Sequence, residues 1–282
     1  MSPNVVLAGL IGRGILASRT PSLHEHEGDA QALRYLYRLI DADQLGLDDS
    51  ALPDLLDAAQ RTGFTGLNIT YPFKQAILPL LDELSEEAQG IGAVNTVVLK
   101  DGKRVGHNTD CLGFAEGLRR GLPDAPRDQV VQLGAGGAGS AVAHALLGEG
   151  VGRLVLFEVD TARGQALVDN LTARFGEGRA VLGTELAAAV AAADGLVNTT
   201  PVGMAKLPGT PLPVALLHAG LWVAEIIYFP LETELLRHAR ALGCRTLDGG
   251  SMAVFQAVKA FELFSGRVAD AGRMQAHFAS LG

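Results

Sequence analysis

The segment VVQLGAGGAGSAVAHALL, which begins at Val130, constrains the fold of this chain more than any other stretch. Its glycines follow the pattern G-x-G-x-x-G between a strand-like run and a helix-like run. In that pattern the first glycine permits a tight turn, the second lets a pyrophosphate approach the backbone, and the third lets the helix pack on the strand. The N-terminus of the helix then offers N–H groups to phosphates. The predicted dinucleotide-binding loop is Gly134, Ala135, Gly136, Gly137, Ala138 and Gly139.

An acidic residue, Glu158, stands at the end of the next strand-like run, RLVLFEV. A carboxylate in that place accepts hydrogen bonds from both ribose hydroxyls and repels a 2′-phosphate, so the sequence predicts NAD rather than NADP. Asp160 is a second candidate for this role. Arg163 could offset part of the repulsion, although a solvated helix residue is the simpler interpretation.

Strand-like and helix-like runs alternate along the chain, which favours an α/β fold. In the first part we expect strands at 5–12, 66–70, 94–100 and 104–107, and helices at 30–40, 52–62 and beyond Phe73. A polar, proline-containing segment, 117–128, precedes the glycine loop, and further on strands are expected at 153–159, 195–200, 222–228 and 243–249, with a last helix at 251–264. The expected domains are an α/β substrate-binding and catalytic domain of residues 1–116 and 250–282, and a Rossmann domain of residues 117–249 with a doubly wound parallel sheet.

Composition excludes several classes of protein. The 282 residues carry a net charge of -8 and no basic cluster, which argues against nucleic acid or an anionic membrane as the main partner and favours a small molecule. Cys111 and Cys244 lie far apart in no metal-ligand spacing, so we expect no metal and reduced thiols in a cytoplasm. No apolar run of about 18 residues is present. His24-Glu25-His26 resembles a metal clip, but such pairs are usually surface or turn residues, and no function is assigned to it.

Polar side chains stand at the ends of the apolar runs in the first half of the chain, as in a pocket for a polyhydroxylated ligand. Lys74 and Asp110 are the pair that could do acid–base chemistry, because hydride removal from an alcohol leaves a proton that a group of suitable pKa must take. For Asn68, Asn108 and Thr109 a simple turn-forming role is equally acceptable. The remaining members of the set are Ser18, Thr20, Thr70, Asn95 and Thr96.

These residues lie in blocks that resemble the shikimate dehydrogenase family, most closely its quinate/shikimate dehydrogenase branch. The blocks span nearly the whole chain in the family's order. They are GLIGRGILASRTPSLHE (9–25), GLNITYPFKQ (66–75), IGAVNTVV (91–98), GHNTDCLGF (106–114), LGAGGAGSA (133–141), NTTPVGM (198–204) and the long segment from Tyr228 to Phe264.

The resemblance implies a cytoplasmic enzyme of aromatic amino acid biosynthesis, in the chorismate pathway, with its active site in the cleft between the two domains. It implies that Lys74 and Asp110 are the catalytic pair, and that Ser18 and Thr20 hold the substrate carboxylate. The implied pocket is completed by Thr70, Asn95, Tyr228 and Gln256. The implied cofactor contacts beyond the glycine loop are Thr199, Thr200, Pro201, Met204, Gly249 and Met252, with the last two near the nicotinamide.

Departures from the family pattern bear on the substrate and the cofactor. Common members have Ser-x-Ser-Pro where this chain has Ser18-Arg19-Thr20-Pro21, a feature that resembles enzymes which also accept quinate. Glu158 and Asp160 replace a basic pattern, which again favours NAD. We therefore expect oxidation of the 3-hydroxyl of shikimate or quinate.

Three alternatives stay open: an amino analogue of shikimate as substrate, a non-catalytic sensor that binds the same ligands, and a different two-domain NAD(P) dehydrogenase such as one that uses a folate. The Ser18/Thr20 and Asn-Thr-Asp blocks disfavour the folate enzyme, while Lys74 and Asp110 in their motifs disfavour the sensor. A homodimer is left open.

Overall fold

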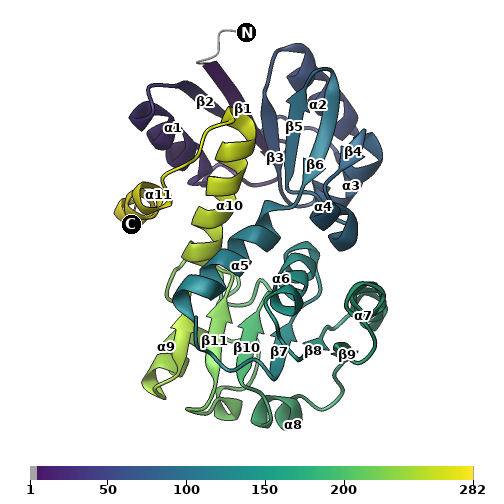
Figure 1. Ribbon diagram of the computed structural model, residues 1–282, viewed down its shortest axis with the longest axis vertical. Helices are drawn as coiled ribbons and strands as arrows, with labels where there is room; N and C mark the ends of the chain where they lie inside the picture. Colours follow the sequence, from purple (N-terminus) through teal and green to yellow (C-terminus); the bar gives the residue numbers. More distant parts are fainter. Residues whose placement is uncertain (1–4, 282) are drawn as a thin grey trace. The chain divides into compact units, whose positions relative to one another are not determined.

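The computed structural model describes residues 5–281. The chain divides into two compact units, Met1–Thr109 with Val254–Gly282, and Asp110–Ala253. Figure 1 shows one sheet with its helices in each unit. No helix within the described residues combines the length and the apolar character that crossing a membrane requires.

The first unit contains a mixed sheet in the order β2-β1-β3-β5-β6-β4 (Figure 1). Its strands are β1 (Val5–Gly12), β2 (Arg34–Asp41), β3 (Gly66–Ile69), β4 (Glu83–Leu84), β5 (Thr96–Lys100) and β6 (Lys103–His107). Strands β1, β2 and β3 are parallel, whereas β5 is antiparallel to β3 and to β6. The carboxyl ends of β1, β3 and β6 and the amino end of β5 therefore meet at one edge of the sheet.

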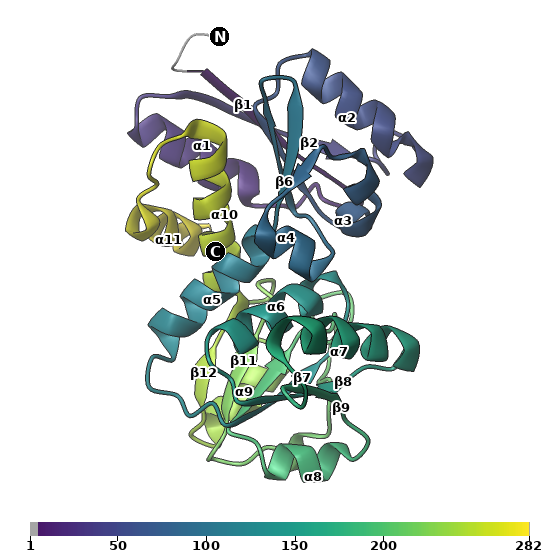
Figure 2. The same cartoon turned by 45° about the vertical axis from the view of Figure 1, so that its right-hand side comes forward.

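Helices surround this sheet. They are α1 (Thr20–Ala30), α2 (Leu52–Arg61), α3 (Phe73–Ala76), α4 (Glu86–Ile91) and α11 (Ala271–Ser280), together with most of α10 (Gly249–Ser265). Helix α2 turns Leu52, Leu56 and Ala59 toward a core that also contains Leu67 and Phe73. Helix α11 lies beside α1, as Figure 2 shows.

The expected helix over residues 30–40 is wrong, because this segment contains the strand β2. Tyr35 and Tyr37 are each 5% exposed, whereas Leu36 between them is 61% exposed, which is the two-residue alternation of a strand. The helix lies earlier, and Pro21 in its first turn suits a helix start. This helix also buries His24 completely, so the interpretation of that histidine as a surface or turn residue is wrong as well.

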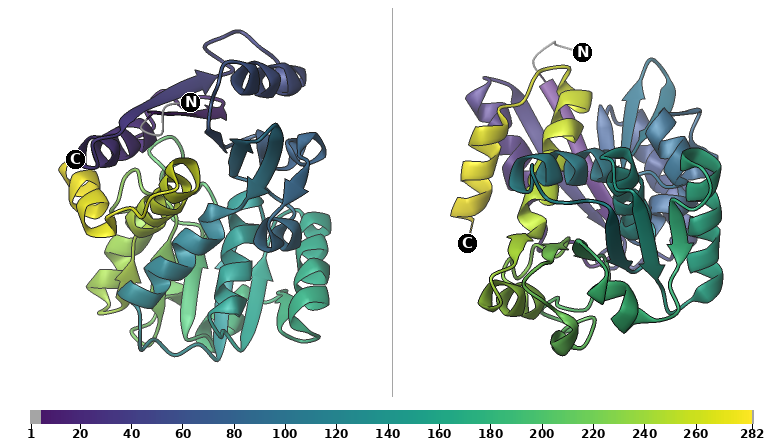
Figure 3. Two further views of the ribbon diagram at one scale, coloured as in Figure 1. Left: turned by 45° about the horizontal axis from the view of Figure 1, so that its top comes forward. Right: turned by 60° about the horizontal axis from the view of Figure 1, so that its bottom comes forward.

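The second unit is a parallel sheet in the order β12-β11-β10-β7-β8-β9, and Figure 3 shows it with helices along both faces. Its strands are β7 (Gln129–Leu133), β8 (Arg153–Phe157), β9 (Ala180–Leu182), β10 (Gly195–Asn198), β11 (Trp222–Glu225) and β12 (Arg245–Leu247). Its helices are α5 (Thr109–Gly121), α6 (Gly137–Gly148), α7 (Thr161–Phe175), α8 (Leu186–Ala191) and α9 (Glu234–Ala241). All five strand pairings are parallel, so the predicted doubly wound sheet is confirmed.

Candidate active site

The glycine loop between β7 and α6 has the shape that a pyrophosphate requires. Gly134 has a φ of 95°, and a Cβ atom there would lie 2.9 Å from the Thr199 hydroxyl. A Cβ at Gly139 would lie 2.7 Å from the Gly134 carbonyl, whereas one at Gly136 would meet nothing within 4 Å. No side chain caps the N-terminus of α6. The loop therefore leaves open space and helix N–H groups where a phosphate would bind, so these residues fit a dinucleotide.

Two side chains hold this loop in place through hydrogen bonds to carbonyl groups in it and beside it. Gln132, fully buried in β7, donates through Nε2 to the carbonyls of Gly134 and Gly139, at 2.9 and 2.8 Å. The Thr199 hydroxyl donates to the carbonyls of Leu133 and Gly134, at 2.7 and 3.0 Å. Thr199 was predicted as a cofactor contact, and the structure gives its hydroxyl a bracing role.

Glu158 lies beside the glycine loop, and both of its carboxylate oxygens accept hydrogen bonds from groups of the protein. Oε2 accepts from the Ala135 amide at 2.7 Å, and Oε1 accepts from the Asp160 amide at 3.1 Å and from Arg163 at 2.7 Å. Burial alone would raise the pKa of Glu158, but these hydrogen bonds outweigh it and hold the pKa below its usual value. Asp160 caps α7 through the Arg163 amide. Arg163 is an exposed residue in the first turn of α7, as expected, and it also forms an ion pair with Glu158.

Two further segments of the second unit contain the other predicted cofactor contacts, and the second of them contains the two residues predicted to lie near the nicotinamide. The Thr200 hydroxyl and amide both donate to Asn198 Oδ1, at 2.7 and 3.0 Å, which shapes the turn that contains Pro201. Met204 lines a mostly apolar pocket with Phe229 and Pro230.

The second of these segments starts α10. A Cβ at Gly249 would lie 2.4 Å from the carbonyls of Ile226 and Ile227, so only glycine fits there. Met252, one turn further along α10, is 9% exposed.

In the first unit, the loop after β1 brings Ser18 and Thr20 together. The Ser18 hydroxyl donates to Thr20 Oγ1 at 3.1 Å, and both residues are partly exposed. This loop is fixed by Asp41, whose carboxylate accepts from the amides of Gly14 and Ile15 at 3.1 and 2.8 Å. These hydrogen bonds hold the pKa of Asp41 below its usual value against the opposing effect of burial.

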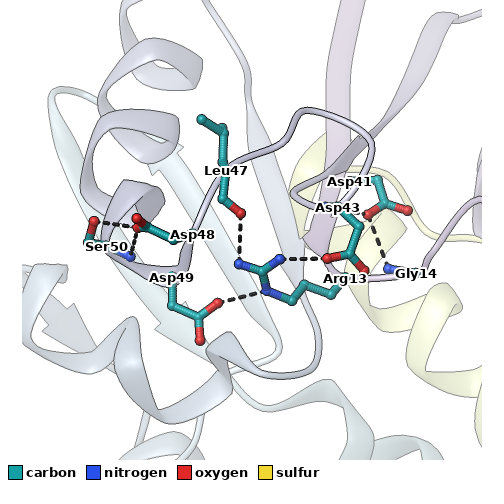
Figure 4. Close-up of polar contacts among 8 residues, drawn as sticks. All are labelled: Arg13, Gly14, Asp41, Asp43, Leu47, Asp48, Asp49 and Ser50. Atoms are coloured by element: carbon teal, nitrogen blue, oxygen red, sulfur yellow. Dashed lines mark hydrogen bonds and ion pairs between the residues drawn. The ribbon is translucent and has the colours of Figure 1, made fainter.

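Figure 4 shows that Arg13 joins this loop to the segment after β2. Its guanidinium donates to Asp43 at 2.5 Å, to Asp49 at 2.7 Å and to the Leu47 carbonyl at 2.8 Å. Two hydroxyl groups are thus presented on a braced loop, which suits recognition of a carboxylate.

Thr70 and Lys74 follow β3 at the same edge of the sheet. The Cγ2 atom of Thr70 lies so close to Gly12 that a Cβ there would be 2.3 Å away, and the Thr70 hydroxyl makes no hydrogen bond within residues 5–281. Lys74 is half-buried in the single turn α3, and its carbonyl accepts from the Val94 amide at 2.8 Å. This contact ties the Lys74 turn to the segment that contains Asn95.

Asn95 belongs to a buried polar network. Its Oδ1 accepts from the Thr109 amide at 2.7 Å and from the Thr96 hydroxyl at 3.1 Å, and its Nδ2 donates to Thr109 Oγ1 at 3.0 Å. Asn68 extends the network from Thr96 to the hydroxyl of Tyr37. Thr109 therefore contacts the Asn95 side chain directly, and Asn68 supports it through the Asn95 main-chain carbonyl and the Thr96 hydroxyl.

The other predicted residues are distributed over both units. Asp110 is 7% exposed and is the second residue of α5, directly after the Thr109 amide that Asn95 binds. Tyr228 is 40% exposed in the second unit, and Gln256 lies on α10 in the part assigned to the first unit. The pairing of Lys74 with Asp110 and the joint pocket stay predictions.

The sequence interpretation missed four residues that shape these sites. They are Arg13, Asp41, Gln132 and Glu225. Two of them carried a readable signal, because Gln132 lies in an apolar strand and Glu225 lies at the end of one, where a buried polar group needs a partner. Asp41 follows a segment that was expected to be a helix. Arg13 looked like an ordinary loop residue.

The braced glycine loop on an all-parallel sheet and the acidic residue beside it define a dinucleotide-binding protein of the dehydrogenase class. The family model for the shikimate dehydrogenase substrate binding domain matches residues 10–97. A shikimate dehydrogenase (NADP(+)) of Streptomyces avermitilis is 56% identical over 100% of this chain and 97% of its own length. A quinate/shikimate dehydrogenase (NAD(+)) of Corynebacterium efficiens is 53% identical over the full length of both chains.

Among solved structures, quinate dehydrogenase from Corynebacterium glutamicum in complex with NAD matches with a TM-score of 0.93 and 51% identity, over 98% of this chain and 99% of the other. The chain belongs to the shikimate dehydrogenase family, as its sequence blocks predicted.

Proposed function

We propose that this protein is an NAD-dependent dehydrogenase that oxidises the 3-hydroxyl of shikimate, quinate or both. The observation that carries the proposal is the set of groups at one edge of the first sheet: the Ser18/Thr20 hydroxyl pair, the unbonded Thr70 hydroxyl, Lys74 and Asn95. Such a set suits a small carboxylic acid with several hydroxyl groups. Relatives over the full chain length are named for these two acids.

Oxidation of a secondary alcohol removes a hydride from carbon and a proton from oxygen. When bound, NAD supplies the hydride acceptor. In the proposed reaction, Lys74 takes the hydroxyl proton and Asp110 orients the ammonium group that results. Ser18 and Thr20 hold the carboxylate, while Thr70, Asn95, Tyr228 and Gln256 bind ring hydroxyls.

The choice of NAD rests on Glu158. Its carboxylate, fixed by the Ala135 amide next to the phosphate loop, would repel a 2′-phosphate. Arg163 neutralises part of that charge, and the relatives include enzymes named for either cofactor. We propose that NAD is preferred, and that Glu158→Gln lowers the ratio of kcat/KM for NAD to that for NADP.

The test is the initial rate of the purified protein with quinate or shikimate, each against NAD and NADP, followed by absorbance of the reduced cofactor. Lys74→Ala should lower kcat at least about a hundredfold with NAD affinity nearly unchanged. Lys103→Ala serves as the control, because Lys103 is an exposed lysine that pairs with Glu83. Turnover retained in Lys74→Ala would contradict the assigned role.

The four substrate and cofactor pairs also separate the alternatives. Turnover with NADP alone would show that Arg163 and not Glu158 decides the cofactor. Ligand binding without turnover by any pair would favour an amino analogue of shikimate as substrate or a sensor. A cytoplasmic location and a homodimer are also proposed; cell fractionation tests the first, and sedimentation at assay concentration tests the second.

A further inference from the structure

Glu225, the last residue of β11, is a buried carboxylate whose hydrogen bonds connect two segments that carry proposed cofactor contacts; one of them, the start of α10, carries the proposed nicotinamide contacts. It is 1% exposed. Oε1 accepts from the amides of Ile226 and Ile227 at 3.0 and 3.2 Å. Asn198 Nδ2 donates to both oxygens, at 3.1 and 3.0 Å, and the Thr233 hydroxyl donates to Oε2 at 3.3 Å. One side chain therefore ties together the ends of two strands and the start of α9.

The partners of Glu225 lead directly to the proposed cofactor residues. Asn198 fixes Thr200 through Oδ1, and its Nδ2 also donates to the Val202 carbonyl at 2.9 Å, which shapes the turn before Met204. Ile226 and Ile227 present the carbonyls that abut Gly249 at the start of α10. A change at Glu225 would thus reach both segments.

All the hydrogen bonds that Glu225 accepts come from neutral donors. Among the ionisable groups on the neighbouring elements, Glu234 pairs with Arg237 and His238 on α9, Arg240 pairs with Glu232, and Asp248 accepts from the Gly250 amide. Arg245 starts β12 and lies in register with Trp222, at the opposite end of β11 from Glu225. No cation of the described chain therefore pairs with this carboxylate. Burial raises the pKa of Glu225 to about 7, although the hydrogen bonds from Asn198, Ile227, Thr233 and Ile226 oppose the increase.

We propose that Glu225 is a positioning residue for the nicotinamide-binding segments and that its unpaired negative charge favours the oxidised, cationic nicotinamide ring over the neutral reduced ring. This inference rests on the proposed function, because the proposed cofactor contacts locate the ring. An opposite charge in a poorly solvated region stabilises a cation more than it does a neutral group.

The experiment measures the dissociation constants of NAD+ and NADH by calorimetry between pH 6 and pH 8.5 for the wild-type protein and for Glu225→Gln. In the wild type, the affinity for NAD+ relative to NADH should rise roughly fivefold as Glu225 ionises, which is the size expected for a screened interaction between unit charges. In Glu225→Gln the ratio should be low and independent of pH. Glu232→Gln removes an exposed carboxylate near α9 and should behave like the wild type.

A second variant keeps the inference testable if Glu225→Gln folds poorly. Thr233→Val removes one neutral donor to the carboxylate, so the pH at which the NAD+/NADH ratio changes should move upward. A ratio that is independent of pH in the wild type, or unchanged in Glu225→Gln, would overturn the inference while leaving the proposed function intact. Failure of the wild type to bind NAD+ at all would instead contradict the proposed function.

Discussion

Acidification from pH 7 to pH 5 should destabilise the chain, and the completely buried His24 should contribute a measurable part of this loss. This residue is fully buried on α1 among Tyr35, Tyr37, Phe261 and Phe264, with ring centroids 4.8 to 6.1 Å away. Its Nδ1 shares a hydrogen bond with the Tyr35 hydroxyl at 2.9 Å, whereas its Nε2 has no hydrogen-bond partner among residues 5–281. Whichever tautomer the neutral ring has, the charged ring would therefore hold a buried Nε2–H without an acceptor, and burial lowers the pKa of His24 to about 3.

The sign and size of the effect follow from linkage. Between the lowered pKa in the folded state and the ordinary histidine value of about 6.5, the unfolded chain binds a proton that the folded chain does not. Stability therefore falls as the pH falls below about 6.5, and at pH 5 the loss due to His24 is about 2 kcal/mol.

Urea unfolding at pH 7 and pH 5 measures this loss of stability for the wild type and for His24→Phe, which keeps an aromatic ring among the same neighbouring rings. The variant should lose less stability than the wild type on acidification, by about 2 kcal/mol. His26→Gln, which removes an exposed imidazole from the same helix, serves as the control. An identical loss in wild type and His24→Phe would refute the argument.

Three further perturbations test other parts of the structure. Gly66→Ala places a Cβ 2.1 Å from the Phe264 ring and should lower the free energy of unfolding in urea by about 2 kcal/mol. Gly148→Ala, with open space around it, should not lower this free energy, and equal stabilities of the two variants would contradict the packing argument. Asp41→Asn should raise the KM for the acid substrate roughly tenfold by loosening the Ser18 loop, while Asp48→Asn, an exposed cap seen in Figure 4, should leave KM unchanged. Arg273→Ala removes the bidentate partner of the fully buried Glu27 and should speed amide hydrogen exchange in α11 (Ala271–Ser280) relative to the rest of the chain. Unchanged exchange in α11 would show that the ion pair does not anchor this helix.

The second unit could be predicted well because its signals are local. The glycine loop, the strands around it and Glu158 are each read within a few residues. The first unit was harder: RYLYRLID alternates buried tyrosines with exposed Arg34, Leu36 and Arg38, yet its composition also suits a helix. Only pairing of β2 with β1 selects the strand, and that contact is not visible in the segment itself.

Residues of the candidate site could be predicted from the sequence where the type of side chain alone suggests a catalytic or binding role. Lys74, Ser18 and Thr20 were identified as polar groups in motifs, and the structure brings the two hydroxyls together. The residues that orient them were not identified, because bracing depends on contacts between distant segments. Arg13 binds Asp49 across 36 positions of the chain, and Asn198 binds Glu225 across 27.

The network around Asn95 also fixes the polarity of the hydrogen bond that this residue can offer a ligand. The Thr109 amide can only donate, so it sets the orientation of the Asn95 side-chain amide, and Oδ1 is fully used by Thr109 and Thr96. One Nδ2 hydrogen is bound by Thr109 Oγ1, and the other Nδ2 hydrogen is the only part of the Asn95 side-chain amide without a partner in the described part of the chain. Asn95 can therefore serve a ligand as a donor but never as an acceptor. An alcohol oxygen and a ketone oxygen both accept such a bond, so the same contact would suit the substrate before hydride transfer and the product after it.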